Sequence, residues 1–185
     1  MIYVLDNNVF SRSFQNLSMD VFDDIWEPWS QYIHLGKIIS VDEVYEELKA
    51  WGYISRKEND DIKTWLQTHK RCFLNPTNEE GHILTNIFAN KKFQECVKES
   101  SLRSGSPEAD AFLIAKAKHV GGIIVTTEKY KPNSAKIPTI AIFMGIPYMG
   151  LNEFYRLLRN VYHGRPEECN VKICKQPGKP EQLIL

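Results

Sequence analysis

Acidic and amide side chains directly follow an uninterrupted apolar segment at the start of the chain. Residues 2–5, Ile-Tyr-Val-Leu, are followed by Asp6, Asn7 and Asn8. An apolar run without polar alternation is typical of a central strand in a parallel sheet, and ligands bind where such strands end. Asp6 is therefore a candidate functional carboxylate, although an Asp at this position can also simply cap a turn or the next helix.

A second acidic residue follows a second apolar segment. Residues 123–125, Ile-Ile-Val, form a predicted buried strand, and Glu128 comes three positions after its end. Because the carboxyl ends of parallel strands lie at the same edge of a sheet, Asp6 and Glu128 are expected at the same edge.

Helical spacing selects a third carboxylate from a group of neighbouring acids. Val44, Leu48 and Trp51 recur at the spacing of one helix face and are expected to point inward. Glu47 lies at the edge of this stripe and is a candidate for the site. Glu46 is expected to face solvent.

Asp110 is the fourth candidate. Leu113, Ile114 and Ala117 follow it by three, four and seven residues, so helical spacing places Asp110 on the apolar face of its helix. An unpaired charge would be costly there, and Asp110 is expected to need a cation, hydrogen-bond donors or a metal. Residues 106–107, Ser-Pro, are expected to start this helix.

The four carboxylates could converge on one metal ion or on a pair of ions. Hard oxygen ligands, with no histidine or cysteine required, select Mg²⁺ or Mn²⁺ over Zn²⁺. Such an ion keeps several waters and completes its shell with substrate phosphate. The expected ligands are Asp6, Glu47, Asp110 and Glu128.

The order and spacing of these segments resemble the PIN-domain family of metal-dependent ribonucleases, notably its small bacterial members that act as toxins of toxin–antitoxin pairs. The resemblance spans nearly all of residues 1–161. It rests on residues 4–9, 44–48, 109–117 and 125–128.

This resemblance implies a three-layer α/β/α fold with a central, mostly parallel sheet, and an endoribonuclease that hydrolyses RNA phosphodiester bonds with Mg²⁺ or Mn²⁺. The implied catalytic and metal-binding residues are Asp6, Glu47, Asp110 and Glu128, with Asn8 and Thr126 as accessory polar residues. In the implied mechanism, the ion lowers the pKa of a bound water that attacks the phosphodiester in line. The implied partners are an RNA substrate, an antitoxin protein and a second copy of the chain.

The chain departs from the family pattern in two places. Many members carry a shorter Asp where this sequence has Glu128, and the extra methylene could shift or weaken one metal position. The segment 165–185, which contains several Pro and Gly residues, is expected to form an extended tail after a domain of residues 1–164.

Substrate contacts are expected in the polar loop that follows Glu128. Lys129 and Lys131 are candidates for binding phosphate because they lie next to a predicted metal ligand. Tyr130 could stack a base, although packing is the more frequent fate of a tyrosine.

Strands alternate with helices along the chain, which predicts an α/β domain with right-handed crossovers. Residues 138–144 fit a helix or a strand, and the helix is favoured. Helices are further expected near residues 22–33, 44–51, 62–66, 77–88, 107–117 and 152–161, and strands near 2–5, 38–39, 123–125 and 146–149.

Length and composition exclude several classes of protein. The 185 residues suit one domain, and 23 basic residues balance 23 acidic ones, so nucleic acid would have to bind a local patch. The chain begins with a strand and has no membrane-length apolar run, so a soluble cytoplasmic protein is expected. Four scattered cysteines favour reduced thiols over disulfides or a zinc site. Glycine-rich nucleotide loops and Gly-x-Ser-x-Gly elbows are absent from the sequence.

Two alternatives remain open at this level. A haloacid dehalogenase-like phosphohydrolase would also place an Asp after its first strand, but that family needs a second Asp two residues later, where this chain has Asn8. A non-catalytic module that binds RNA or a protein partner could keep the same fold while the acids serve structure.

Overall fold

A five-stranded, all-parallel sheet forms the centre of the protein in the computed structural model, which describes residues 1–52, 60–89, 93 and 109–166. The strand order is β3-β2-β1-β4-β5, and β1 pairs with β2 and β4. The strands are β1 (Tyr3–Leu5), β2 (Ile38–Val41), β3 (Phe73–Leu74), β4 (Ile123–Val125) and β5 (Tyr148–Met149).

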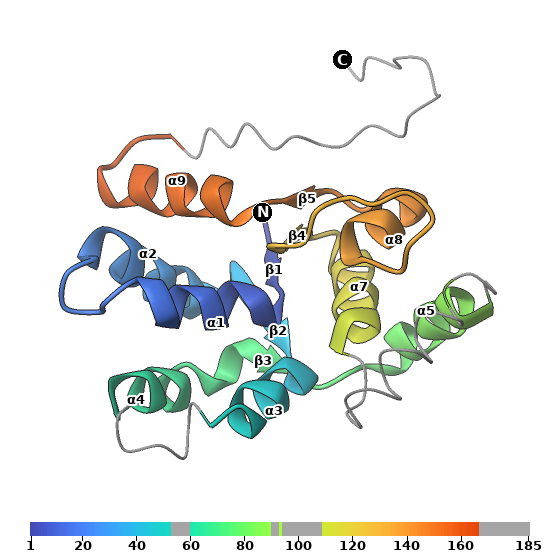
Figure 1. Ribbon diagram of the computed structural model, residues 1–185, viewed down its shortest axis with the longest axis horizontal. Coiled ribbons are helices and arrows are strands. Elements are labelled where there is room, and N and C mark those ends of the chain that lie inside the picture. Colours follow the sequence, from blue (N-terminus) through green and yellow to red (C-terminus); the bar gives the residue numbers. More distant parts are fainter. Residues whose placement is uncertain (53–59, 90–92, 94–108, 167–185) are drawn as a thin grey trace.

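Helices cover both faces of this sheet. Figure 1 shows α1, α2 and α9 on one side of the strands and α7 and α8 on the other. The helices are α1 (Asn7–Asn16), α2 (Asp23–His34), α3 (Asp42–Ala50), α4 (Asp60–Thr68), α5 (Asn78–Ala89), α7 (Ala109–Val120), α8 (Ile137–Met144) and α9 (Leu151–Tyr162), and a 3₁₀ turn spans Lys70–Cys72. The α/β class with a parallel sheet between helical layers is thereby confirmed.

Most elements lie where the sequence predicts them, including the favoured helix at 138–144. A capping box starts α5: the Thr77 amide donates to Glu80, and the Glu80 amide donates to the Thr77 hydroxyl. The predicted start of α7 at residues 106–107 and nearly all of the predicted tail lie outside the described residues. The domain limit at residue 164 stays a prediction.

The structure differs from the sequence prediction in several elements. Helix α1 and the two-residue strand β3 were not predicted. Trp51 is 51% exposed, since α3 ends at Ala50 and the side chain leaves the apolar face. Helix α9 begins at Leu151, one residue before its predicted start, with Gly150 as its N-cap residue.

An aromatic cluster fixes α1 against the neighbouring helices. The Phe10 ring lies 5.6 Å from the Trp29 ring and 5.2 Å from the Phe73 ring, measured between centroids. Trp29 is fully buried and also meets Phe154 of α9 edge to face at 5.1 Å. Such pairs stabilise the core beyond the area they bury. These contacts therefore fix the position of the first turn of α1, which follows Asp6.

In the described ranges, no helix combines the length and apolar character that crossing a membrane requires.

Candidate functional site

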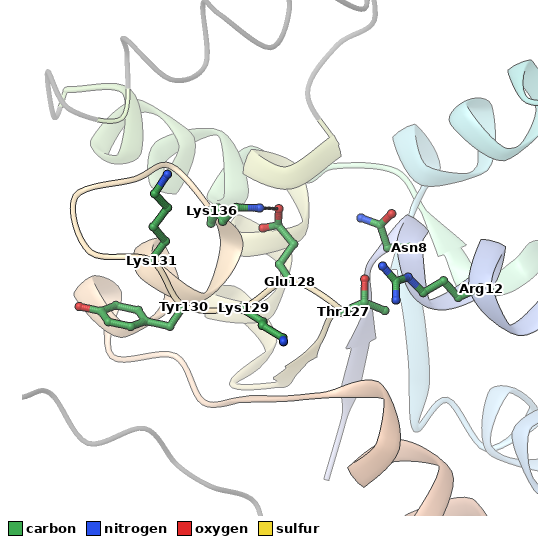
Figure 2. A pocket seen from close by; sticks show the side chains of 8 residues that line it. All are labelled: Asn8, Arg12, Thr127, Glu128, Lys129, Tyr130, Lys131 and Lys136. Carbon is green, nitrogen blue, oxygen red and sulfur yellow. Dashed lines mark hydrogen bonds and ion pairs between the residues drawn. The ribbon is translucent and has the colours of Figure 1, made fainter.

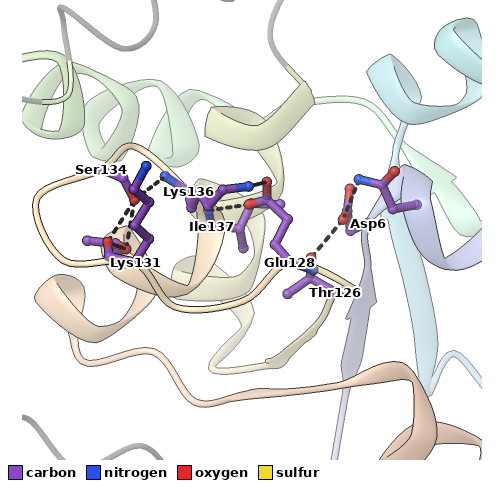
Figure 3. A network of polar contacts seen from close by, with 9 residues as sticks. Asp6, Thr126, Glu128, Lys131, Ser134, Lys136 and Ile137 are labelled. Atoms are coloured by element: carbon purple, nitrogen blue, oxygen red, sulfur yellow. Dashed lines mark hydrogen bonds and ion pairs between the residues drawn. The ribbon is translucent and has the colours of Figure 1, made fainter.

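Asp6 lies at the carboxyl end of the central strand β1 and is only 3% exposed. Its Oδ2 accepts hydrogen bonds from the Thr126 hydroxyl at 2.8 Å and from the Asn8 amide nitrogen at 3.3 Å (Figure 3). Thr126 comes from the end of β4, and Asn8 comes from the first turn of α1. The structure thus brings Asp6 together with Asn8 and Thr126, the two predicted accessory residues. The bond across the sheet to Thr126 is an interaction that capping of α1 would not need.

The ionised form of Asp6 is disfavoured in this environment. Burial raises its pKa from an ordinary 3.8 to about 6, and the nearby negative charge of Glu128 adds to this effect. Hydrogen bonds from Thr126 and Asn8 oppose the rise without cancelling it. A cation bound beside Asp6 would stabilise the carboxylate.

Glu47 of α3 is half-buried, and its Oε2 accepts a 2.6 Å hydrogen bond from the Asn7 side chain. Burial raises the Glu47 pKa, and the negative charge of Asp6 raises it further, whereas hydrogen bonds from Asn7 and from the Ala109 amide oppose the rise. Glu47 is therefore within electrostatic reach of Asp6 and touches the start of α7. Glu46 is exposed, as predicted, and pairs with Lys49 at 3.0 Å.

Asp110 occupies the first turn of α7, next to the Ala109 amide that Glu47 approaches. The prediction that Asp110 is buried on an apolar face is wrong, because its side chain is exposed. Helix α7 is buried on most of its surface, so spacing relative to Leu113 and Ile114 did not identify one inner face. Assignment of Asp110 to the site stays a prediction, and its place in the fold is beside Glu47.

Both oxygens of Glu128 are already engaged. Lys136 Nζ lies 2.7 Å from Oε1, and the Ile137 amide, at the start of α8, donates to Oε2 at 2.8 Å (Figure 3). The Glu128 amide donates to the Thr126 hydroxyl oxygen at 3.1 Å. Glu128 is thus connected to Asp6 through Thr126, yet its carboxylate faces a lysine and a helix N-terminus.

The donor chemistry of the pair formed by Asp6 and Glu47 fits Mg²⁺ or Mn²⁺. Burial disfavours the ionised form of both carboxylates, the charge of Asp6 disfavours that of Glu47 further, and Asn7 Oδ1 is a buried acceptor without a hydrogen-bond partner. Across the described residues, however, no group of three or more His, Cys, Asp or Glu side chains is arranged to hold an ion. A third carboxylate ligand is therefore not in place among the described residues.

A basic pocket of about 740 Å³ opens next to these carboxylates. Figure 2 shows Asn8 and Arg12 of α1 on one side and the loop with Tyr130 and Lys131 on the other. Four cationic side chains face a single carboxylate in its lining, which consists of Asn8, Arg12, Thr127, Glu128, Lys129, Tyr130, Lys131 and Lys136. The pocket is suited to anions, and it contains both lysines that the sequence analysis selected.

Arg12 and Asn7 are site residues that the sequence analysis missed. Arg12 follows Asn8 by four residues, so a helix that starts directly after Asp6 places both on one face. Recognising α1 would have identified it. Lys116, by contrast, lies away from the solvent: it is 3% exposed and pairs with Glu80 at 2.8 Å.

The raised pKa of Asp6 predicts a pH-dependent stability in the absence of metal. The unfolded chain loses the Asp6 proton near pH 3.8 and the folded protein near pH 6, so stability decreases as pH rises through this window. Asp6→Asn removes this titration. The variant is expected to gain about 3 kcal/mol relative to wild type between pH 4 and pH 7. Urea unfolding in EDTA measures the difference, and a constant difference across this range would contradict the assignment.

Comparisons with known proteins place the chain in a family. Among solved structures it is similar to VapBC2 from Rickettsia felis, crystallised with a DNA fragment from its promoter, at 13% identity and a TM-score of 0.45, covering 81% of this chain and 98% of that chain. A match of this size supports no statement about activity. No curated protein matches the sequence. Residues 3–162 match the family described as a domain of unknown function (DUF4411), and the chain belongs to this family.

Proposed function

We propose that the protein is a PIN-like, metal-dependent endoribonuclease that hydrolyses RNA phosphodiester bonds with Mg²⁺ or Mn²⁺. The observation that carries the proposal is the pair formed by Asp6 and Glu47. These carboxylates come from separate elements, the charge of Asp6 raises the pKa of Glu47, and Asp6 lies at the carboxyl edge of a parallel sheet. The adjoining basic pocket provides a place for the phosphates of a substrate.

In this proposal, Asp6, Glu47 and Asp110 would hold the ion. When bound, it would lower the pKa of a water and neutralise charge on the phosphate. Thr126 and Asn8 orient the Asp6 carboxylate through their hydrogen bonds, and Asn7 does the same for Glu47. Glu128, the fourth predicted ligand, is already engaged by Lys136 and the Ile137 amide.

The proposal is tested with purified protein and a fluorescently labelled RNA of mixed sequence. Cleavage is expected with Mg²⁺ or Mn²⁺ and is expected to stop in EDTA. Metal binding is measured in parallel by calorimetry with Mn²⁺. Binding of Mn²⁺ without cleavage of any RNA would argue against the nuclease function.

A second candidate is a non-catalytic PIN-like module that binds RNA or a protein partner. The arrangement of the acids favours it in one respect, because no group of three metal-ligating side chains is assembled among the described residues. This module would bind RNA in EDTA as well as in Mn²⁺ and would show no metal uptake by calorimetry. The toxin role, an antitoxin partner and a homodimer also remain proposals, which come from the sequence resemblance alone.

Lys129 and Lys131 are expected to contribute to RNA binding through phosphate contacts. Both are exposed and line the pocket beside Glu128. In EDTA, where the proposed reaction cannot proceed, substituting each lysine with Gln is expected to weaken binding of an RNA oligonucleotide. Each substitution should also make the negative slope of log K against log salt concentration shallower by about 0.7. Fluorescence anisotropy measures both effects. Lys49→Gln, on the exposed face of α3, is the matched control, and equal losses in all three variants would contradict a specific pocket.

A further inference from the structure

Glu128 is the member of the predicted acidic set whose contacts are already satisfied. One oxygen faces the Lys136 ammonium at 2.7 Å, and the other accepts from the first amide of α8 at 2.8 Å. A carboxylate at a helix N-terminus is stabilised by the helix dipole and by the unpaired amides of the first turn. A metal ion at Glu128 would have to compete with the Lys136 ammonium and the Ile137 amide for the carboxylate oxygens, so the residue does not fit the role of a ready ligand.

The length of the side chain explains this arrangement. Glu128 reaches past the end of β4 to the start of α8, a span that a side chain shorter by one carbon–carbon bond of about 1.5 Å would not cover without backbone movement. The loop in between is also tied to α8, because the Ser134 and Thr139 hydroxyls both donate to the Lys131 carbonyl, at 2.8 and 2.7 Å. Glu128 therefore anchors one end of an organised basic loop.

Lys136 is held in a position from which it can still bind an anion. Its side chain is 43% exposed, whereas that of Glu128 is 19% exposed, and both residues line the pocket. An ammonium has three N–H donors, and the ion pair uses only part of this capacity. Figure 2 shows Lys136 and Glu128 paired within the pocket that Arg12, Lys129 and Lys131 also line.

We propose that Glu128 is a positioning residue that holds Lys136 at the pocket, and that the Lys136 ammonium takes the place of a second metal ion by binding a phosphate of the RNA substrate. This inference rests on the proposed nuclease function. It implies a centre with one metal ion, bound by the carboxylates around Asp6 and Glu47, and one lysine cation. It also accounts for the Glu at a position where the resembled family more often has Asp.

The first test counts metal ions and asks whether Glu128 binds one. Calorimetric titration with Mn²⁺ is expected to give one ion per wild-type chain. Glu128→Gln and Glu128→Asp are expected to keep that number and an affinity within about threefold of wild type. If Glu128 is a ligand, Glu128→Gln loses tenfold or more in affinity or loses one of two ions, because removing a ligand or its support has effects of this size. That result would overturn the inference.

The second test measures RNA binding in EDTA, so it does not depend on metal or on cleavage. Lys136→Met and Glu128→Asp are each expected to weaken binding of a labelled RNA oligonucleotide about tenfold, the size expected for a charged hydrogen bond. Lys136→Arg is expected to bind within about threefold of wild type. The double variant Glu128→Asp/Lys136→Met should bind no worse than Lys136→Met, since both changes remove one interaction.

The matched controls are Glu46→Asp and Lys49→Met, which alter an exposed Glu–Lys ion pair on α3. They are expected to change neither the affinity for Mn²⁺ nor the affinity for RNA. Unchanged RNA binding by Lys136→Met, or tighter binding by Glu128→Asp, would overturn the inference. The two proposals can fail separately. Absence of cleavage by the wild-type protein counts against the nuclease function, whereas the binding experiments in EDTA decide the role of Lys136 in either case.

Discussion

Asp6→Asn is expected to lower the rate of metal-dependent RNA cleavage by about a thousandfold or more. Asp6 is the most deeply buried carboxylate of the site, and an amide in its place has no charge to hold a cation. Asn has nearly the same shape and can accept the hydrogen bond from Thr126, so the fold should be retained. Initial rates with the same labelled RNA at saturating Mn²⁺ measure the effect.

Glu46→Gln is the control for this experiment, because it removes one negative charge from the exposed face of α3, next to Glu47. Its rate should stay within about twofold of wild type. Equal rates for Asp6→Asn and wild type would show that the reaction takes place elsewhere on the molecule.

Lys116→Met is expected to lower the free energy of unfolding by about 3–5 kcal/mol. Lys116 is buried in α7, where it pairs with Glu80 at 2.8 Å and donates to the Asn75 carbonyl at 3.0 Å. Met fills a similar volume but leaves the Glu80 carboxylate buried opposite an uncharged side chain. Breaking one half of a buried pair is costly for this reason. Urea unfolding at neutral pH measures the change.

Replacing both members of the pair is expected to cost much less stability than replacing Lys116 alone. Lys116→Met combined with Glu80→Leu should recover most of the lost stability, because no buried charge remains. Lys49→Met, which breaks an exposed pair, should change stability by less than about 1 kcal/mol. A cost for Lys116→Met no larger than that for Lys49→Met would contradict this prediction.

The strand-end residues of the site could be predicted because their signal is local. Residues 2–5 and 123–125 are apolar runs that end in polar residues, and parallel pairing then brings Asp6 and Thr126 together. Glu46 is exposed and Glu47 half-buried, as helical spacing predicts, since α3 is amphipathic and has one buried face; the role of Glu47 in the site stays a prediction. The spacing of apolar residues is informative wherever an element has one buried face and one solvent-exposed face.

The same reasoning fails for α7 because that helix lies between the sheet and α5. Apolar and even charged side chains are buried around most of it, as Lys116 illustrates. The spacing of apolar residues cannot then show whether an acidic side chain such as that of Asp110 faces the core or the solvent. Exposure of Asp110 depends on neighbouring elements, which are far away in the sequence.

Helix α1 was missed because Asn, Ser and Arg interrupt its apolar residues. Packing of Phe10 and Phe14 into the aromatic cluster stabilises a segment whose own propensity is modest. Tertiary contacts of this kind are not visible in a single sequence. The partner of Glu128 could not be predicted for a similar reason. Lys129, Lys131 and Lys136 all follow it in the sequence, and only the fold shows that Lys136 makes the contact.

The sheet order has a consequence for the newly made chain. The hydrogen bond from Thr126 to Asp6 joins residues 120 positions apart, and β4 lies directly beside β1. A growing polypeptide that stops before residue 123 would contain Asp6 and Glu47 but would lack Thr126, most of the basic pocket and one neighbour of β1. If the proposed function holds, the protein cannot attack RNA during its own synthesis until most of its length has left the ribosome.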